Sequence, residues 1–540
     1  MKKAGVTMIL DNVKIYQPYE GYKANNIYHI EVHEGRIVGI HKGRYSSSND
    51  QVIDVNGKTI MAGYNDSHMH LLRFGLLKKE LDLTQVTSWK EMKEEVEKHY
   101  PEIEEEEWIF GKGFNDGQFT DIDHLLTAED LDEINVNKYM YFMHQDGHEC
   151  VISKKLLNKL EEEERFHKEP EDFKERDQNG ELTGRFKDTA VHYINHHLWE
   201  RSLQEATEAL ETAMPHLLKY GVTSVHTDDR SFIGSYKSLW KAYTEAEKRG
   251  NLPIQAHLHH YIFDRQDLES FIDSFDKRTG DGTDRVKVGA IKIFLDGTQR
   301  LHTAAMRQPY PDQPDSTGNL IYTQEQLNDM VSLASQNGMQ VAMHALGDRA
   351  VESALTALEQ YEANTEKLRH RIIHAQTMGE DLLKRTSKVG AYIETQPSFL
   401  MGEWNEKDQW VPETLLPYCD AFHKMIDHDI PITLSSDAPI GSLDPITSVF
   451  AAVNRTNTDH EPKGGWMQQE RLSKDQSFYG FGVTPAELEF QEKKKGKIQV
   501  GHVADFVLLN NHPETVKNHE LLNLMVEETW IQGECVFSRE

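Results

Sequence analysis

Two histidines, His68 and His70, stand two positions apart at the end of an apolar stretch, in "AGYNDSHMHLL". In a β-strand, residues i and i+2 point to the same face, so both imidazoles can reach one metal ion. The pair alone is weak support for a metal site, because a polar loop can carry the same residues. Its interpretation depends on which other ligand groups the chain supplies.

Three further ligand-type residues follow other apolar stretches. His344 ends "MQVAMH", His374 ends "RIIH" and Asp437 ends "ITLSSD". Enzymes built on (β/α)8 barrels place their active sites at the carboxyl ends of the strands. Each histidine alone would more often be structural, and Asp437 alone fits a turn before Pro439. Together with the first pair they indicate one metal site.

Lys292 lies within the apolar stretch "GAIKIFLDG". A bare ammonium facing the interior from a buried strand is costly. One interpretation is that the amine is carbamylated, which makes an anionic carboxylate able to bridge two metal ions. The alternative is a lysine that is partly exposed or held in a salt bridge.

The elements that must position these groups alternate between strand-like and helix-like segments. This alternation favours a parallel sheet, and eight strand-like runs suit an α/β fold of the (β/α)8 barrel type. We assign the barrel to residues 62–484, with an insertion at about 75–215 that has strands near 108–114 and 138–153. The eight runs lie at 58–68, 221–229, 254–263, 288–297, 339–348, 371–377, 391–399 and 430–439.

Both ends of the chain are rich in strand patterns. Residues 1–61 and 485–540 are predicted to form one discontinuous β-sandwich domain. A turn is expected at "HEGR", residues 33–36, and the Asn-Gly pair at 56–57 is typical of a β-hairpin. Within the barrel, Thr323 is the expected N-cap of a helix that stops at Gly338.

Composition excludes several classes of protein. The net charge of −30 would repel nucleic acid and anionic membranes. None of the three cysteines lies in a CxxC pair, which argues against a disulfide framework or a thiolate zinc site. The chain has no run of about 18 apolar residues, and its start lacks a signal-peptide pattern. We expect a cytoplasmic protein that acts on a small molecule.

Several stretches together resemble the amidohydrolase superfamily, and within it amidohydrolase family 3, whose members include N-substituted formamide deformylase-like hydrolases. The resemblance covers nearly the whole chain. It implies a distorted (β/α)8 barrel with a β-sandwich from both termini, and two divalent ions, usually zinc. The stretches are "MAGYNDSHMHLLRFG", "FMHQDGHECVIS", "NGELTGRFKD", "YGVTSVHTDD", "VKVGAIKIFLDGTQRLHTAAM", "QVAMHALGDRAV", "HRIIHAQ", "PITLSSDAPIGSLDP" and "GKIQVGHVADFVLL". The implied ligands are His68, His70, carbamylated Lys292, His344, His374 and Asp437.

The implied reaction is hydrolysis of a non-peptide C–N amide bond by metal-activated hydroxide. Asp437 acts as general base and then acid. His148 or His226 is a candidate oxyanion donor, although "DGH" at 146–148 also fits a simple turn. Asp296 either supports a ligand or caps a loop. An N-formyl or other N-acyl amine is the family-level substrate, and the resemblance suggests a dimer.

Two positions depart from the family pattern. The usual His-Asp after the second strand is "HTDD" here, with Asp228 two residues after His226, and a usual glutamate is replaced by Asp188. We therefore assign neither aspartate as a ligand. Two other functions stay open: a mononuclear deaminase of the same superfamily, and a non-catalytic scaffold on the same barrel. The sequence lacks the H-x-x-E expected of the deaminase near His344 and His374, and the scaffold would have lost the ligands that this chain keeps.

Overall fold

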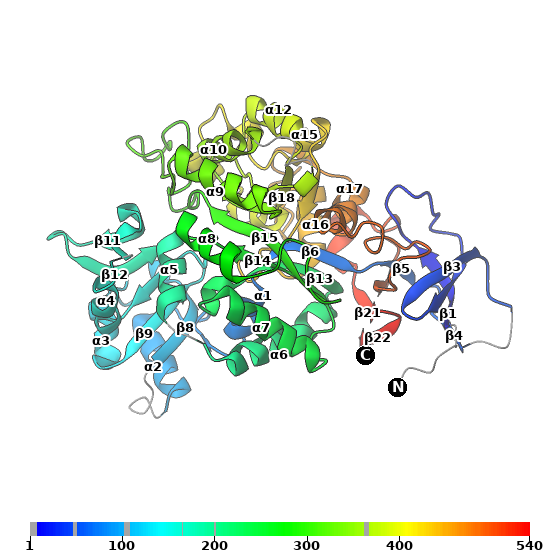
Figure 1. The fold of residues 1–540 in the computed structure, drawn as a ribbon, viewed down its shortest axis with the longest axis horizontal. Coiled ribbons are helices and arrows are strands. Elements are labelled where there is room, and N and C mark those ends of the chain that lie inside the picture. The colour runs from blue at the N-terminus through cyan, green and yellow to red at the C-terminus, as the bar shows by residue number, and fades with distance from the viewer. Residues whose placement is uncertain are drawn as a thin grey trace.

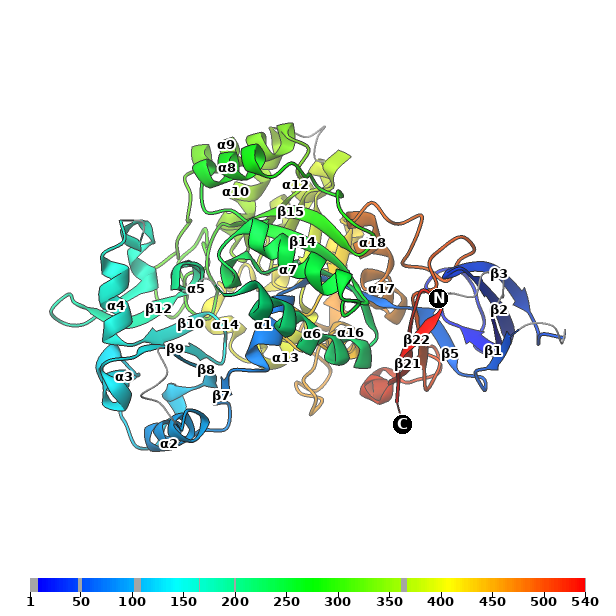
Figure 2. The same cartoon turned by 60° about the horizontal axis from the view of Figure 1, so that its bottom comes forward.

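The structure, a computed structural model, describes residues 8–46, 51–101, 108–164, 166–198, 201–360 and 367–539. Three regions lie in a row along the long axis of the molecule (Figure 1). Parallel strands with surrounding helices form the centre, an inserted sheet lies at one end, and strands from both termini lie at the other. A view turned by 60° keeps this order (Figure 2).

The central region is a barrel of eight parallel strands within the described residues. Ser67 and Thr433 lie 2.7 Å apart through their hydroxyls, and the N–H of Asp437 donates to the carbonyl of His68 at 2.9 Å, so the first and last strands meet. The strands are buried on both faces, as parallel strands covered by helices are. Their order is β6 (Tyr64–Met69), β13 (Val222–Asp228), β14 (Gln255–Tyr261), β15 (Val286–Phe294), β16 (Val341–Ala345), β17 (Arg371–His374), β18 (Tyr392–Thr395) and β19 (Ile432–Leu434). Each of the eight predicted runs overlaps one of them, so the barrel prediction is confirmed.

Helices follow the barrel strands and cover the outer face of the barrel. The predicted N-cap Thr323 accepts a hydrogen bond from the N–H of Gln326, and Gly338 adopts φ +71° just after that helix, a conformation that glycine tolerates. The helices are α1 (Leu71–Leu77), α6 (Leu203–Lys219), α7 (Tyr236–Lys248), α8 (Arg265–Ser274), α9 (Gln324–Gln336), α10 (Asp348–Glu359), α12 (Glu380–Val389), α13 (Leu400–Glu403), α14 (Lys407–Trp410), α15 (Phe422–Asp427), α16 (Pro445–Asn454), α17 (Lys474–Gly480) and α18 (Val483–Leu488). Among the described residues, no helix combines the length and the apolar character that are needed to span a bilayer.

The inserted region occupies residues 81–198, between the first two barrel strands. Its sheet has the order β11-β12-β10-β9-β8-β7 and carries an apolar core on each face. The strands predicted near 108–114 and 138–153 are present as β8, β9 and β10. The strands are β7 (Leu81–Asp82), β8 (Trp108–Phe114), β9 (Tyr139–His144), β10 (Glu149–Ile152), β11 (Lys174–Arg176) and β12 (Leu182–Lys187), and the helices are α2 (Trp89–His99), α3 (Ala128–Asn135), α4 (Lys154–Glu161) and α5 (Asp188–Leu198).

The terminal strands form a sheet path in the order β22-β21-β20-β5-β1-β2-β3, with β4 also paired to β1. The predicted turn at residues 33–36 joins β2 and β3 as an antiparallel hairpin. A buried core of aliphatic and aromatic side chains, including Phe506 and Trp530, holds the two chain ends together. The strands are β1 (Met8–Ile15), β2 (Tyr28–His33), β3 (Arg36–Lys42), β4 (Gln51–Asp54), β5 (Thr59–Ala62), β20 (Phe506–Leu509), β21 (Val526–Ile531) and β22 (Glu534–Ser538).

The hairpin predicted at the Asn-Gly pair is wrong. Asn56 and Gly57 do form a turn with positive φ, at 55° and 75°. The flanking strands do not pair with each other: β4 pairs in parallel with residues 8–11 of β1, and β5 pairs in parallel with residues 14–15. The strands on either side of the turn therefore run in the same direction. They pair one after the other along β1, because β1 offers backbone partners to both of them.

Candidate active site

Six side chains from the carboxyl ends of five barrel strands converge on one small void of about 10 Å³. These are the six residues that the sequence predicts as metal ligands: His68, His70, Lys292, His344, His374 and Asp437. All six are buried. Five other residues complete the wall of the void: Arg73, His148, His192, Phe294 and Ile440.

Three of the six form a tight group around one carboxylate. The Nε2 atoms of His68 and His70 lie 3.4 and 3.2 Å from Asp437 Oδ1. This oxygen has no hydrogen bond of good geometry within the described chain. The three ligand atoms lie within 4.8 Å of one another, which suits a shared cation. Burial raises the pKa of Asp437, but its interactions with His70, His374 and Lys292 outweigh this and lower the pKa below its usual value.

Asp437 is held in this place by its backbone. Its φ is +53°, a left-handed conformation that few non-glycine residues adopt. The hydrogen bond from its N–H to the carbonyl of His68 ties this residue to the first strand. The conformation is thus a local strain that aims the carboxylate at the histidines.

Hydrogen bonds on the outer sides of three histidines fix the inner nitrogens. His70 Nδ1 lies 2.6 Å from the carbonyl of Asp228, His344 Nε2 lies 3.3 Å from the carbonyl of Gly297, and His374 Nδ1 lies 2.7 Å from Gln396 Oε1. A carbonyl oxygen only accepts, so each of these ring nitrogens carries the proton. In the neutral form of a ring held this way, the other nitrogen presents a lone pair to the void, the arrangement usual for metal-bound histidines.

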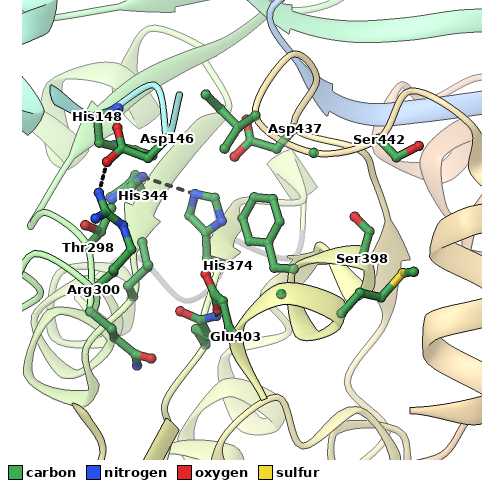
Figure 3. Close-up of a pocket in the computed structure, with 18 of the residues that line it drawn as sticks. Asp146, His148, Thr298, Arg300, His344, His374, Ser398, Glu403, Asp437 and Ser442 are labelled. Carbon is green, nitrogen blue, oxygen red and sulfur yellow. Dashed lines mark hydrogen bonds and ion pairs between the residues drawn. The ribbon is translucent and has the colours of Figure 1, made fainter. Parts of the chain in front are cut away.

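The consequence of these proton positions is clearest between His344 and His374 (Figure 3). His344 Nδ1 and His374 Nε2 lie 3.1 Å apart, and both are the unprotonated nitrogens. Burial lowers the pKa of His374 to about 4 and that of His344 well below its usual value, so neither ring is an imidazolium at neutral pH. Two bare lone pairs at this distance repel unless a cation lies beside both. The donor set of the site therefore fits a divalent metal.

Lys292 lies at the centre of the cluster with an unusual environment. Its side chain is completely buried, and Nζ has no hydrogen-bond partner among the described residues. Nζ lies 4.5 Å from the centroid of the Phe294 ring. Burial lowers the pKa of the amine, against the opposing charges of Asp228, Asp437 and Glu394. A partly exposed lysine, one of the two alternatives left open by the sequence, is excluded.

His148 reaches the site from the inserted sheet. The "DGH" turn between β9 and β10 places it beside both the void and the larger cavity described below. His148 Nδ1 lies 3.4 Å from Asp188 Oδ1, and the hydroxyl of Thr303 donates to the other oxygen of Asp188. The stretch is thus a turn that also places the side chain of His148 at the site. Asp188, which stands where the family pattern has a glutamate, orients His148.

Asp296 and Asp228 support the histidines in different ways. The carboxylate of Asp296 accepts the N–H groups of Ala305, Gly347 and Leu346 at 2.8, 2.9 and 3.1 Å, and lies 3.8 Å from His344. It therefore ties the loop after β15 to the start of α10. Asp228 acts on His70 through its backbone carbonyl.

His226 does not lie at the void or the cavity, so its suggested role as an oxyanion donor requires correction. It is the fifth of seven residues in β13 and completely buried, with Nε2 2.7 Å from Glu489 and Nδ1 2.7 Å from Arg371, the first residue of β17. Residues alternate between the two faces of a strand, but depth along the strand decides which end of the barrel a side chain reaches. His226 belongs to the amino-terminal end.

A cavity of about 430 Å³ opens onto the void (Figure 3). Apart from Asp437, its charged groups are paired: Arg300 contacts Asp146 and Glu149, and Glu403 accepts from Lys407 at 2.7 Å. Leu346, Phe399, Met401 and Ile440 give it a largely apolar wall. The cavity and the void share His148, His344, His374, Asp437 and Ile440.

Sequence reasoning missed the residues that shape this cavity. Phe399 ends the short 3-10 helix η5 (Pro397–Phe399) after β18, and Met401 follows in α13. Arg73 is also missed. It is buried, and its guanidinium donates to the carbonyl of Gly147 at 3.1 Å, which holds the turn before His148. An arginine within the apolar helix "LLRFGLL" was the one available signal for it.

The barrel and its buried ligand cluster define a metal-dependent hydrolase of the barrel type. The chain belongs to the amidohydrolase family, whose model matches residues 51–537. It is 28% identical over 505 residues to the Bacillus subtilis (strain 168) protein YtcJ, which is named as an amidohydrolase, with 92% of each chain covered. It is 25% identical over 509 residues to the N-substituted formamide deformylase of Arthrobacter pascens, covering 91% of this chain and 90% of that one.

Solved structures agree on the fold. A metal-dependent hydrolase from Pyrococcus horikoshii superimposes with a TM-score of 0.75 at 23% identity, covering 95% of this chain and 99% of the other. A second one, from Pyrococcus furiosus, gives a TM-score of 0.72 at 24% identity, with 94% and 99% covered. The predicted family and fold class are thus confirmed.

Proposed function

We propose that this protein hydrolyses a non-peptide C–N amide bond of a small molecule, such as an N-substituted formamide or another N-acyl amine, with two divalent ions. The observation that carries the proposal is the pair of unprotonated nitrogens of His344 and His374, 3.1 Å apart beside a buried lysine. In the tautomers that the outer hydrogen bonds favour, a cation beside both nitrogens stabilises this arrangement.

The ligand cluster divides naturally into two groups. His68, His70 and Asp437 would hold one ion, and His344 and His374 the other. N/O ligation of this kind suits zinc and several other first-row ions. When bound, such ions lower the pKa of water from about 15.7 toward about 7 and polarise a substrate carbonyl.

Lys292 would bridge the two groups as a carbamate. Its neutral amine nitrogen attacks the carbon of CO2, an N–C bond forms, one C–O π bond becomes a lone pair on oxygen, and the nitrogen releases one proton. The product carries two oxygen ligands and one negative charge. The absence of any hydrogen-bond partner for Nζ in the described chain supports this modification, since the carbamate gives the buried group ligand atoms to share.

The remaining chemistry is assigned to residues of this chain. Asp437 accepts the proton of the attacking water and passes it to the leaving nitrogen, as general base and then acid. His148 keeps its Nδ1 toward Asp188, so its other nitrogen is the group available to the substrate oxygen. Stabilising the negative charge that develops there needs a proton on Nε2 in addition to the one on Nδ1, so we assign this role to His148 in its doubly protonated form, paired with the carboxylate of Asp188.

The cavity supports an uncharged, largely apolar N-substituent. Phe399, Met401 and Ile440 offer apolar contact, while the charged groups of the wall other than Asp437 already have partners. Apolar contact excludes water and positions the reacting bond near the ligands. The similarity to the Arthrobacter pascens deformylase supports testing formamides first.

The deciding experiment is metal analysis together with intact mass measurement of a CO2 adduct at Lys292, followed by a screen of N-formyl and N-acyl amines. We expect two ions per chain, dependence on bicarbonate and hydrolysis of a member of the screen. Lys292→Ala should lose the adduct and the activity. The control is Lys287→Ala, on the same strand but only half-buried, which should keep both. One ion per chain without bicarbonate dependence would favour the deaminase alternative instead.

A further inference from the structure

A second group of metal-ligand side chains lies far from the barrel, on the β2–β3 hairpin of the terminal sheet. Along β2 the side chains alternate strictly, with the apolar residues buried and His29 and Glu31 on the outer face. His41 of β3 lies on that same face, directly opposite His29 in the strand register. One imidazole from each strand and a carboxylate two residues along thus share one surface.

The register leaves space for these three groups to converge. Glu31 faces Gly39, which has no side chain. A Cβ added to Gly39 would lie 2.7 Å from His41 Nε2 and 2.8 Å from Glu31 Oε2. The donor atoms of both residues therefore meet over the glycine. One ligand atom from each of His29, Glu31 and His41 lies within 4.8 Å of the others.

His29 is already oriented as a metal ligand. Its Nδ1 lies 3.0 Å from the carbonyl of Gly43, so this nitrogen carries the proton and Nε2 is left with the lone pair. Its ring stacks on that of His41, with centroids 5.1 Å apart and planes at 27°. Glu31 Oε1 lies 3.5 Å from His41 Nε2. The side chains are partly exposed, so an ion can enter from solvent without displacing structure.

We propose that His29, Glu31 and His41 form a second metal site, for a borderline divalent ion such as Zn²⁺, Ni²⁺ or Cu²⁺. Two imidazoles and one carboxylate match these ions, whereas Mg²⁺ and Ca²⁺ require mostly oxygen ligands. Three protein ligands leave at least one position for water. The ion would clamp β3, the last strand of its sheet path, to β2. The site is independent of the function proposed for the barrel.

The test is calorimetric titration of the full-length protein with Zn²⁺, after its active-site metal has been loaded and free metal removed. The wild type should bind one additional ion per chain. His41→Asn, at a position with 54% of its side chain exposed, should fold normally and lose that ion. His423→Asn removes another exposed histidine, 43% exposed and 3.7 Å from Asp427, and should retain the ion.

A second variant separates a built site from adventitious binding to surface histidines. Gly39→Ala keeps all three ligands but fills the point where they meet, so it should weaken Zn²⁺ binding at least tenfold. Absence of the additional ion in the wild type, or an unchanged ion in His41→Asn or Gly39→Ala, would overturn the proposal.

Discussion

The barrel contains two polar clusters at its two ends, and each of them includes histidines, one lysine and one carboxylate. The rim cluster comprises His68, His70, Lys292, His344, His374 and Asp437 at the carboxyl ends of the strands. The floor cluster comprises Asn65, Ser224, His226, His257, Glu489 and Lys495 near the amino ends. Both are completely or almost completely buried. They differ in how their hydrogen-bonding groups are matched.

In the floor cluster every other member approaches the carboxylate of Glu489. Lys495 Nζ lies 2.5 Å from it, Asn65 Nδ2 and His226 Nε2 lie 2.7 Å away, and His257 Nε2 lies 3.2 Å away. Burial raises the pKa of Glu489, but His257 and Lys495 outweigh it and hold the pKa well below its usual value. The negative charge of Glu489 is thus matched by the ammonium of Lys495 within the cluster, although Asn65 Oδ1, His257 Nε2 and Glu489 Oε2 have no hydrogen bond of good geometry in the described chain.

In the rim cluster the groups face one another unmatched. His344 and His374 present two lone pairs to each other, and Lys292 Nζ has no hydrogen-bond partner in the described chain. The comparison shows that residue type alone does not identify a metal site. The distinguishing property is a convergence of acceptors that only a cation completes.

The largest expected effect is on catalysis by the rim cluster. Asp437→Asn keeps the size of the side chain but removes the base, and should lower kcat/KM by about 10²- to 10⁴-fold, the usual contribution of general acid–base catalysis. Steady-state kinetics checks this, with circular dichroism to verify the fold. Asp427→Asn, exposed at 62%, serves as control. Near-normal turnover in Asp437→Asn would remove this residue as the proton shuttle.

Changes in the floor cluster should lower the stability of the folded protein. Glu489→Ala leaves Lys495 buried without its carboxylate, and removing one partner of a buried ion pair costs about 3–5 kcal/mol of unfolding free energy. Urea denaturation measures the loss, and kcat of the folded fraction should change little. Glu487→Ala, only half-buried, is the matched control. A large drop in kcat with unchanged stability would show that the floor takes part in catalysis.

The contact between the inserted sheet and the rim gives the third prediction. His148→Asn should lower kcat by about 10²-fold, as removal of one oxyanion donor does. Asp188→Ala should reproduce part of this loss, whereas Asp188→Asn keeps an acceptor for the His148 ring and should retain more activity than Asp188→Ala. Equal activity in the two Asp188 variants would argue against a positioning role for this carboxylate.

The last prediction concerns the pH dependence of the floor cluster. Burial lowers the pKa of His226 to about 3, against the opposing effect of the hydrogen bond that His226 donates to the carboxylate of Glu489. The folded state therefore keeps this ring neutral, while the unfolded chain takes up a proton below its ordinary pKa of about 6.5. The free energy of unfolding should fall as the pH drops from about 6.5 to about 3, by about 1.4 kcal/mol per pH unit from this residue. Urea denaturation across this range should give a shallower slope for His226→Gln. Identical slopes in the wild type and in His226→Gln would show that the ring of His226 is already protonated in the folded state, which would contradict the prediction.

Local patterns were enough for much of the barrel. The eight apolar runs overlapped the eight strands because parallel strands buried on both faces are largely apolar, although β6 itself is mostly polar. Polar residues that end such strands meet at one edge, so His68, His70, His344, His374 and Asp437 were predicted together. The pattern failed for His226, since it does not state how deep along the strand a residue lies.

The inserted sheet and the long loops carried no comparable signal. His148 reaches the rim only because β9 and β10 place their turn over it, with Arg73 and Asp188 holding that turn. The Asn-Gly pair predicted a hairpin that β1 prevents by pairing with both flanking strands. In both cases the outcome depended on contacts with residues distant in the sequence, and the spacing of neighbouring residues does not predict such contacts.

By itself, the sequence determined the kinds of groups available and the strands that end in them, because side-chain alternation and apolar runs are local properties. The tertiary structure alone decided which histidines present a bare nitrogen, which are matched by Glu489, and how Lys292 comes to lie without a partner in the described chain. Those outcomes depend on hydrogen bonds and burial between segments hundreds of residues apart, which exist only after the barrel has closed.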